Sequence, residues 1–250
     1  MDDQISLSTT DDGVRHIRLN RPRSLNAMTE QMKVDLTDVI HDSARDRTVR
    51  AVVLEGSGRA FCAGSDVKEM AHFGPEDAER MLTAEHAMFD AVLRLEKPVI
   101  AAVQGYAMGA GFQLAICADV MICTADTRFG MPELGFGAVN GNETALLLPL
   151  GGLTLMRRMI LGQEIFTCSD LAFTGCLSSV VPDADTLSEK VGEVARALAA
   201  TPGGSYGRQK RLILGWLDMA YSSAVNSSIA DAAAGWGDAA NIDAMKHALS

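Results

Sequence analysis

The sequence predicts an α/β core over residues 1–200, followed by a helical region over residues 201–250. Three observations support this division. Short apolar runs such as Val99–Val103 are typical of buried strands, and helical patterns of a dozen or more residues separate several of them. Buried strands that alternate with such helices are characteristic of parallel sheets. Beyond Pro202 no strong strand pattern remains, which favours helices in the rest of the chain.

The first elements are predicted to be a hairpin, a long helix and a buried strand. Ile5–Ser8 and Val14–Leu19 alternate polar and apolar residues around a Thr-Asp-Asp-Gly sequence, whose composition favours a turn. Thr29 can cap a helix that runs to about Arg45 and carries its apolar residues on one side. The run Ala51–Leu54 lies between charged residues and glycines, which indicates a short buried strand.

The same reasoning assigns the remaining elements. Proline, glycine and charged residues delimit each pattern, and the spacing of apolar residues decides between helix and strand. Strands are expected over 99–103 and 120–123, and helices over 75–95, 112–117, 145–161, 187–199, 208–220 and 223–249.

Composition excludes several classes of protein. Hydrophobic residues make up 48% and charged residues 22% of the chain, so it can form a normal globular core. A net charge of −10 argues against general nucleic-acid binding, which needs a cationic surface. No apolar run reaches the ~18 residues of a membrane span, so no membrane partner is expected. The acidic first residues and five scattered cysteines favour a reduced, cytoplasmic protein without a secretory signal.

Common cofactor and hydrolase motifs are absent from the sequence. Gly109-Ala110-Gly111 begins like a dinucleotide fingerprint, but Leu114 stands where the third glycine is needed. The chain has no phosphate-binding P-loop and no G-x-S-x-G nucleophile motif. Its five histidines are too scattered for a recognisable metal site, so we expect no bound metal.

Two segments with small residues at their turns remain as candidates for a chemical function. Residues 59–70 and 97–111 each place small residues where a strand turns into a helix. Such turns expose backbone N–H groups at the positive end of a helix, and two of them side by side form an oxyanion hole. The alternative is that the glycines only permit tight turns. The residue pattern by itself leaves these two interpretations open.

Several ordered motifs resemble the crotonase superfamily, the enoyl-CoA hydratase/isomerase family. They are Leu19–Pro22, Ala63–Met70, Lys97–Gly111 and Phe129–Gly135. The resemblance implies a repeated ββα spiral core, with C-terminal helices that contribute to a homotrimer or a dimer of trimers. It also implies an acyl-CoA substrate and no metal or redox cofactor, because the coenzyme A thioester itself supplies the acidity.

The resemblance also implies roles for individual residues. The backbone N–H groups of Ser65 and Ala110 correspond to the oxyanion hole that stabilises a thioester enolate, and Glu133 corresponds to a catalytic glutamate. The alternative for Lys68 is that it is simply a solvent-exposed lysine on a helix. The alternative for Asp66 is that it caps the helix that follows it. The positions implied for coenzyme A binding are Arg23, Leu25, Ala63, Asp66 and Lys68.

One departure from the hydratase pattern affects the expected reaction. Hydratases of this family use two glutamates to hold and deprotonate a water molecule, and the first of these positions is Gln113 here. Glutamine can orient a polar group but cannot exchange a proton at neutral pH. We therefore expect chemistry with one base, Glu133, such as double-bond isomerisation. There are three alternatives. The first is water addition, and the second is C–C bond formation of the carboxymethylproline synthase type, whose Gln–Glu pair is similar. The third is a non-catalytic acyl-CoA-binding subunit.

A second departure follows Glu133. Hydratases usually carry a Pro-Gly-x-Gly-Gly stretch there, whereas this chain has Val139–Thr144 with an acidic residue, Glu143. At the start of the following helix, Glu143 has three possible roles. It can replace the missing acid, act as a base itself, or only stabilise the positive helix end.

Overall fold

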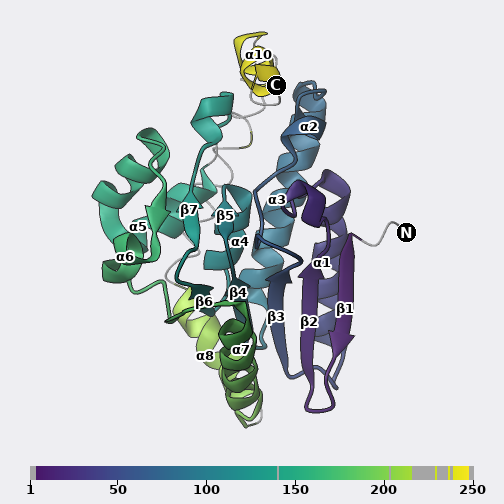
Figure 1. The fold of residues 1–250 in the computed structure, drawn as a ribbon. Coiled ribbons are helices and arrows are strands. Elements are labelled where there is room, and N and C mark those ends of the chain that lie inside the picture. Colours follow the sequence, from purple (N-terminus) through teal and green to yellow (C-terminus); the bar gives the residue numbers. More distant parts are fainter. Residues whose placement is uncertain are drawn as a thin grey trace.

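The computed structural model describes residues 4–139, 141–202, 204–215, 229, 236 and 239–247. Its main feature is a six-stranded sheet (Figure 1). The first two strands pair antiparallel, as the hairpin pattern predicts, and all later neighbours pair in parallel. In order across the sheet the strands are β1 (Ile5–Thr9), β2 (Val14–Leu19), β3 (Ala51–Gly56), β4 (Val99–Val103), β6 (Val120–Thr124) and β9 (Ser179–Val181).

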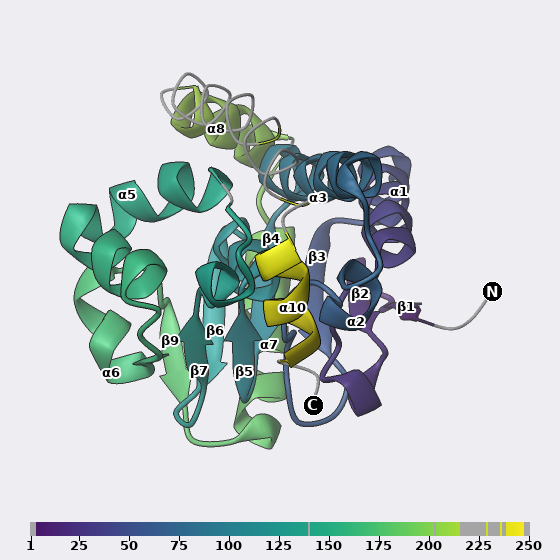
Figure 2. The same ribbon diagram turned by 90° about the horizontal axis from the view of Figure 1, so that it is seen from above.

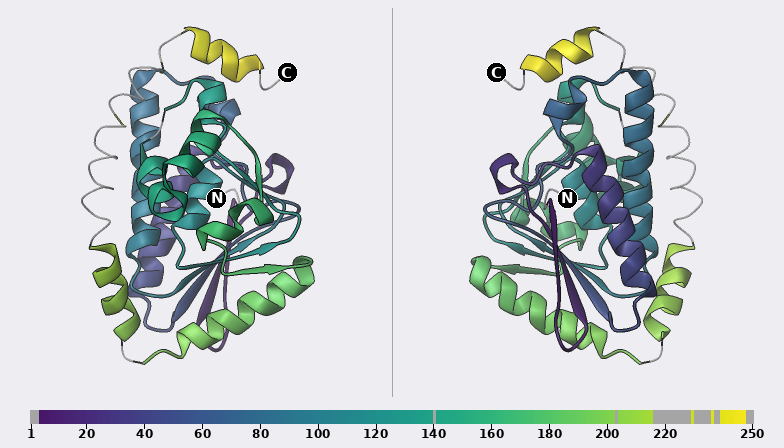
Figure 3. Two further views of the ribbon diagram at one scale, coloured as in Figure 1. Left: turned by 90° about the vertical axis from the view of Figure 1, so that its left-hand side faces the viewer. Right: turned by 90° about the vertical axis from the view of Figure 1, so that its right-hand side faces the viewer.

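Helices cover both faces of this sheet. Helix α7 (Ala184–Ala199) packs on one face, and α1 (Glu30–Arg45) and α3 (Pro75–Arg94) cover the other (Figures 2 and 3). The side-chain alternation of a strand explains this arrangement. In β3, Ala51 and Val53 join the cluster of buried residues that contains α7, whereas Val52 and Leu54 join the larger cluster under α1 and α3.

A second, smaller sheet lies beyond the main one. It contains β5 (Tyr106–Met108), β7 (Arg128–Gly130) and β8 (Phe166–Thr167), with β7 in the centre. Strand β7 pairs in parallel with β5 and antiparallel with β8. Sequence reasoning did not identify these strands or β9, because runs of two or three residues carry no measurable periodicity.

The remaining helices are shorter. Helix α5 breaks at Gly152, which has φ +64°, and a π-helical turn over Arg157–Leu161 follows, so the single helix expected over 145–161 is interrupted. Three 3₁₀ turns are Pro22–Ser24, η2 (Glu133–Phe136) and Ala172–Thr174. The other helices are α2 (Val67–Met70), α4 (Ala110–Ile116), α5 (Asn142–Met156), α6 (Cys168–Leu171), α8 (Ser205–Leu214) and α10 (Ala239–His247).

The C-terminal region is described only in part. Helix α8 shows helical structure after Pro202. Residues 216–220 and most of the helix expected over 223–249 lie outside the described residues. Helix α10 contacts α2 and η2 of the same chain, so this part of the region lies over the core (Figure 2). Among the described helices, none combines the length and apolar character that crossing a membrane requires.

The overall architecture confirms the α/β class. In the described part of the chain, the segment 59–66 contacts two other segments through isolated β-bridges. One bridge pairs Ser65 with Met28, and the other pairs Cys62 with Ala107 of β5. Strand β5 then leads directly into α4 through Gly109. The two segments singled out in the sequence therefore lie side by side.

Candidate active site

One cavity brings together residues from segments 59–70 and 97–111 and from η2. It has an empty volume of about 540 Å³, which includes the part open to solvent. Its apolar lining comes largely from α2, α3 and η2. The polar and small residues that matter for chemistry are Ala63, Ser65, Glu85, Ala110, Glu133 and Trp236.

Gly64 allows the two segments to approach each other closely. Its φ of +99° lies in the region that favours glycine. A Cβ atom at Gly64 would lie 2.9 Å from the carbonyl oxygen of Met108 and 3.6 Å from the backbone nitrogen of Ala110. Because real Cβ atoms do not come so near a carbonyl oxygen, any other residue would push the segments apart. The close approach sets the backbone around Ser65 next to the start of α4.

Two backbone N–H groups at this junction have no acceptor among the described residues. The N–H of Met28 donates to the Gly64 carbonyl at 2.8 Å and that of Asp66 to the Met28 carbonyl at 2.9 Å, which leaves the N–H of Ser65 between them without a bond. Ala110 is the first residue of α4, so its N–H has no intrahelical acceptor. Both residues line the cavity, and such a pair of donors can hold one carbonyl oxygen.

The carboxyl group of Glu133 lies beside these donors. Glu133 follows Pro132 and opens η2, just after β7. A Cβ atom on Gly109 would lie only 2.6 Å from the Glu133 Oε1, so the carboxyl group rests against the residue before Ala110. Its Oε2 is buried and has no hydrogen-bond partner among the described residues. Burial raises the pKa of Glu133 to about 8, and the negative charge of Glu85 adds to this effect.

Sequence reasoning missed a buried ion pair, one member of which, Glu85, lines the same cavity. The Lys33 Nζ lies 2.6 Å from the Glu85 Oε2, and the side chains are 0% and 4% exposed. Ser65 joins them, because its hydroxyl donates to the Glu85 Oε2 at 2.8 Å and accepts from the Lys33 Nζ at 2.8 Å. A signal was present in the sequence. Glu85 occupies the apolar stripe of its helix, with Met88 and Phe89 three and four residues later.

The structure places Gln113 in α4 and Glu143 in α5. Gln113 lies one turn into α4 and is fully buried, but it is not among the residues that line the cavity. Its amide oxygen and nitrogen have no hydrogen-bond partner within the described part of the chain. Glu143 lies in the first turn of α5, as expected, and its side chain is outside the described residues.

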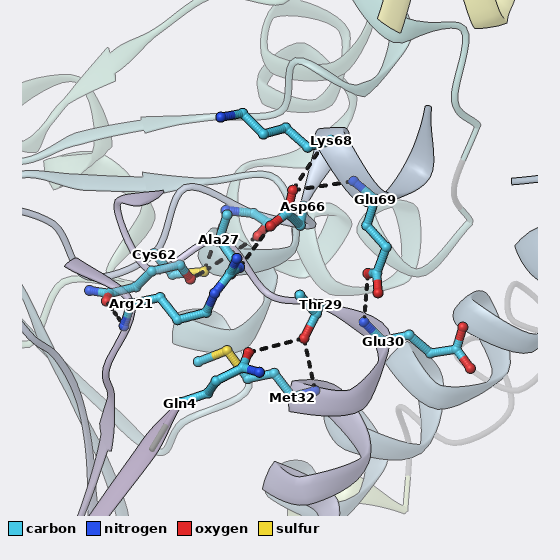
Figure 4. A network of polar contacts seen from close by, with 12 residues as sticks. Gln4, Arg21, Ala27, Thr29, Glu30, Met32, Cys62, Asp66, Lys68 and Glu69 are labelled. Atoms are coloured by element: carbon cyan, nitrogen blue, oxygen red, sulfur yellow. Dashed lines mark hydrogen bonds and ion pairs between the residues drawn. The ribbon is translucent and has the colours of Figure 1, made fainter. Parts of the chain in front are cut away.

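The residues expected at coenzyme A fall into two groups. Leu25 accepts a hydrogen bond from the N–H of Ala63 at 2.9 Å, which ties it to the cavity wall. Asp66 caps α2 by accepting from the N–H of Lys68, and it pairs with Arg21 at 2.7 Å (Figure 4). Thus Asp66 performs the capping role that the sequence allowed.

The two basic residues of this set lie on the surface. The side chains of Arg23 and Lys68 are exposed, and Figure 4 shows the Lys68 chain extending away from the Asp66 contacts. Exposed cations near a cavity are available to phosphate groups. Their contact with coenzyme A stays a prediction.

Comparison with known proteins places this chain in a family. The sequence model described as Enoyl-CoA hydratase/isomerase matches residues 9–211. The chain is 33% identical over 185 residues to the mitochondrial enoyl-CoA hydratase of Pongo abelii, covering 74% of this chain and 63% of that protein. It is 35% identical over 194 residues to the probable enoyl-CoA hydratase of Mycobacterium bovis, covering 76% and 72%.

Solved structures agree with the sequence matches. A crystal structure of an enoyl-CoA hydratase/isomerase from Xanthobacter autotrophicus superposes with a TM-score of 0.87 at 30% identity, covering all of this chain and 94% of that one. An enoyl-CoA hydratase from Mycobacterium avium superposes with a TM-score of 0.89 at 22% identity, covering 98% and 99%, which supports the fold. The chain belongs to the enoyl-CoA hydratase/isomerase family, whose enzymes are lyases or isomerases.

Proposed function

We propose that the protein acts on an acyl-CoA thioester and moves a proton at the carbon next to the carbonyl group. The N–H groups of Ser65 and Ala110 hold the thioester oxygen, and Glu133 exchanges the proton. One observation carries this proposal: a buried carboxyl group lies against Gly109, beside two unbonded N–H donors in a single cavity.

The electrostatics of the cavity support both parts of the step. Removal of an α-proton moves negative charge onto the thioester oxygen, and a backbone donor of this kind typically contributes ~2.7–4 kcal/mol to the transition state. A pKa of about 8 leaves both forms of Glu133 populated near neutral pH. A group that can give and take a proton at the working pH typically contributes a factor of ~10²–10⁴.

Double-bond isomerisation is the reaction that this single step completes. Ionised Glu133 takes an α-proton from a 3-enoyl-CoA. The electron pair of that C–H bond forms a double bond to the carbonyl carbon and displaces the carbonyl π pair onto the thioester oxygen, while the 3,4 double bond stays in place and conjugated with the new enolate. The resulting dienolate is held by the N–H groups of Ser65 and Ala110. Glu133 then returns the proton to the γ-carbon, which gives a 2-enoyl-CoA. No second acid or base is needed.

Water addition to a 2-enoyl-CoA is the second candidate, and the names of the relatives favour it. Hydration shares the enolate with isomerisation but also needs a group that takes a proton from water. The amide of Gln113 cannot do this.

Proton exchange tests the shared step without knowledge of the natural substrate. Butyryl-CoA is incubated in D₂O with wild type, Glu133→Gln or the control Glu79→Gln, which makes the same change on an exposed part of α3. Mass spectrometry should show deuterium uptake by wild type and the control, with at least a ~10²-fold loss in Glu133→Gln. Equal uptake by all three proteins would refute the role of Glu133.

The oxyanion donors need a separate test. Ala110→Pro removes an N–H group at the first position of a helix, where proline is otherwise tolerated. Deuterium uptake should be lost in this variant, while butyryl-CoA binding, measured by calorimetry, weakens far less. Full exchange by Ala110→Pro would show that this N–H does not stabilise the enolate.

A further inference from the structure

Glu85 is a buried charged residue that the proposed proton transfer does not use. It comes from α3, and it lines the same cavity as Glu133, Ser65 and Ala110. Its side chain is 4% exposed and contacts Lys33, which is 0% exposed. An acyl group held by the N–H groups of Ser65 and Ala110 therefore lies in a cavity with two carboxyl groups.

Stability alone is a poor reason to keep this ion pair. Two charges lose their hydration on burial, and replacing such a pair by well-packed apolar residues is often neutral or stabilising. Here the surroundings would suit apolar residues, because Met81 and Leu82 precede Glu85 and Phe89 follows it on the buried side of α3. A buried charge at a cavity wall is more typical of a functional site.

The contacts of Glu85 maintain its charge. Lys33 and the Ser65 hydroxyl both contact its Oε2, and Lys33 lowers the pKa of Glu85 against the opposing effect of burial. Burial without such a partner raises the pKa of Glu133. One cavity thus holds two carboxyl groups whose surroundings move their pKa values in opposite directions, which is the usual arrangement of a catalytic base and a catalytic acid.

We infer that Glu85 is a second catalytic carboxylate, the base that takes a proton from water during its addition to a 2-enoyl-CoA. The inference rests on the proposed enolate step at Ser65, Ala110 and Glu133. It supplies from α3 the function that Gln113 cannot perform.

The bonds and protons balance as follows. Glu85 takes one proton from water, and the water oxygen forms a bond to the β-carbon. The π-electron pair of the double bond moves to the α-carbon and onto the thioester oxygen as an enolate. Protonated Glu133 gives its proton to the α-carbon, which regenerates the carbonyl group and yields a 3-hydroxyacyl-CoA. Exchange with solvent then removes the proton from Glu85 and returns one to Glu133.

Two assays separate this inference from the proposed function. Water addition is followed as loss of the enoyl thioester absorbance of crotonyl-CoA, and α-proton exchange as deuterium uptake by butyryl-CoA in D₂O. Only the first requires activation of water. Glu85→Gln should lower water addition by ~10²–10⁴-fold, with deuterium uptake within about tenfold of wild type. The control Glu79→Gln, on the exposed side of the same helix, should change neither rate.

A double variant guards against loss of the fold. Glu85→Gln leaves Lys33 buried without its carboxylate, whereas Lys33→Met/Glu85→Leu removes both charges and keeps the volume. The double variant should bind butyryl-CoA and exchange its α-protons, yet fail to add water to crotonyl-CoA.

Four results would overturn the inference, and they differ in what they imply. A wild type that exchanges α-protons but adds no water overturns the role of Glu85 alone. So does unchanged water addition in either Glu85 variant, or an equal loss of both activities in variants that still bind butyryl-CoA. A wild type without α-proton exchange overturns the proposed function, and the inference falls with it.

Discussion

Glu133→Gln should make the protein more stable at alkaline pH while it removes proton transfer. The buried carboxyl group has a pKa of about 8 in the folded chain, against an ordinary value of 4.5. Protonation of Glu133 therefore stabilises the folded chain. This contribution to the unfolding free energy is fully present below pH 4.5 and is lost as the pH rises through 8. At ~1.36 kcal/mol per pH unit, this difference corresponds to about 5 kcal/mol of unfolding free energy, an upper value because part of the Glu133 side chain is exposed.

Urea unfolding at pH 5 and pH 9 measures this effect directly. The variant and wild type should differ by less than about 1 kcal/mol at pH 5 and by several kcal/mol in favour of the variant at pH 9. Both proteins must be compared at one concentration, since assembly would shift both midpoints. A stability difference that is the same at the two pH values would show that Glu133 titrates normally, and the acid–base argument would lose its physical basis.

Three further predictions concern the same region. Gly109→Ala places a Cβ atom 2.6 Å from the Glu133 Oε1 at a φ of +51°, so deuterium uptake by butyryl-CoA should fall at least ~10²-fold while calorimetry still detects its binding. Lys33→Met leaves Glu85 buried without its cation and should lower the unfolding free energy by about 3–5 kcal/mol in urea, which Lys33→Met/Glu85→Leu should largely restore. Asn26→Ala removes a buried amide and should cost about 3 kcal/mol in the same assay, because its two Nδ2 hydrogens are shared among three backbone carbonyls of the 57–61 turn and its Oδ1 accepts from the N–H of Arg21. An unchanged urea midpoint in either of the last two would contradict the burial argument.

Local sequence patterns were sufficient for most of the regular structure. The strand Val99–Val103 and the helix that Thr29 caps were predicted with the bounds that the structure has, because a five-residue apolar run and an N-cap are both patterns that a few consecutive residues display. Short strands such as β7 and β8 were not predicted. Two or three residues form a strand only because a partner strand is already in place, and the sequence gives no local sign of that partner.

In the candidate site, too, the sequence predicted the local motifs but not their spatial arrangement. The motifs around Ser65, Ala110 and Glu133 were identified as residue patterns, since glycines at strand-to-helix turns and a carboxylate after Pro132 are visible in one dimension. Their proximity depends on the packing of β5 against the 59–66 segment, which Gly64 permits.

Only the tertiary structure revealed the second carboxyl group of the cavity. Lys33 and Glu85 lie on different helices, each among apolar residues, and neither belongs to a recognisable motif. Sequence determines that a charge falls on the buried face of a helix, because this follows from the 3.6-residue period. The sequence pattern does not determine which charged residue of another helix pairs with this buried charge, because the pairing depends on how α1 and α3 pack above the sheet. The charge state of a buried carboxyl group depends on whether a cation pairs with it. The opposite pKa shifts of Glu85 and Glu133 therefore exist only in the folded chain.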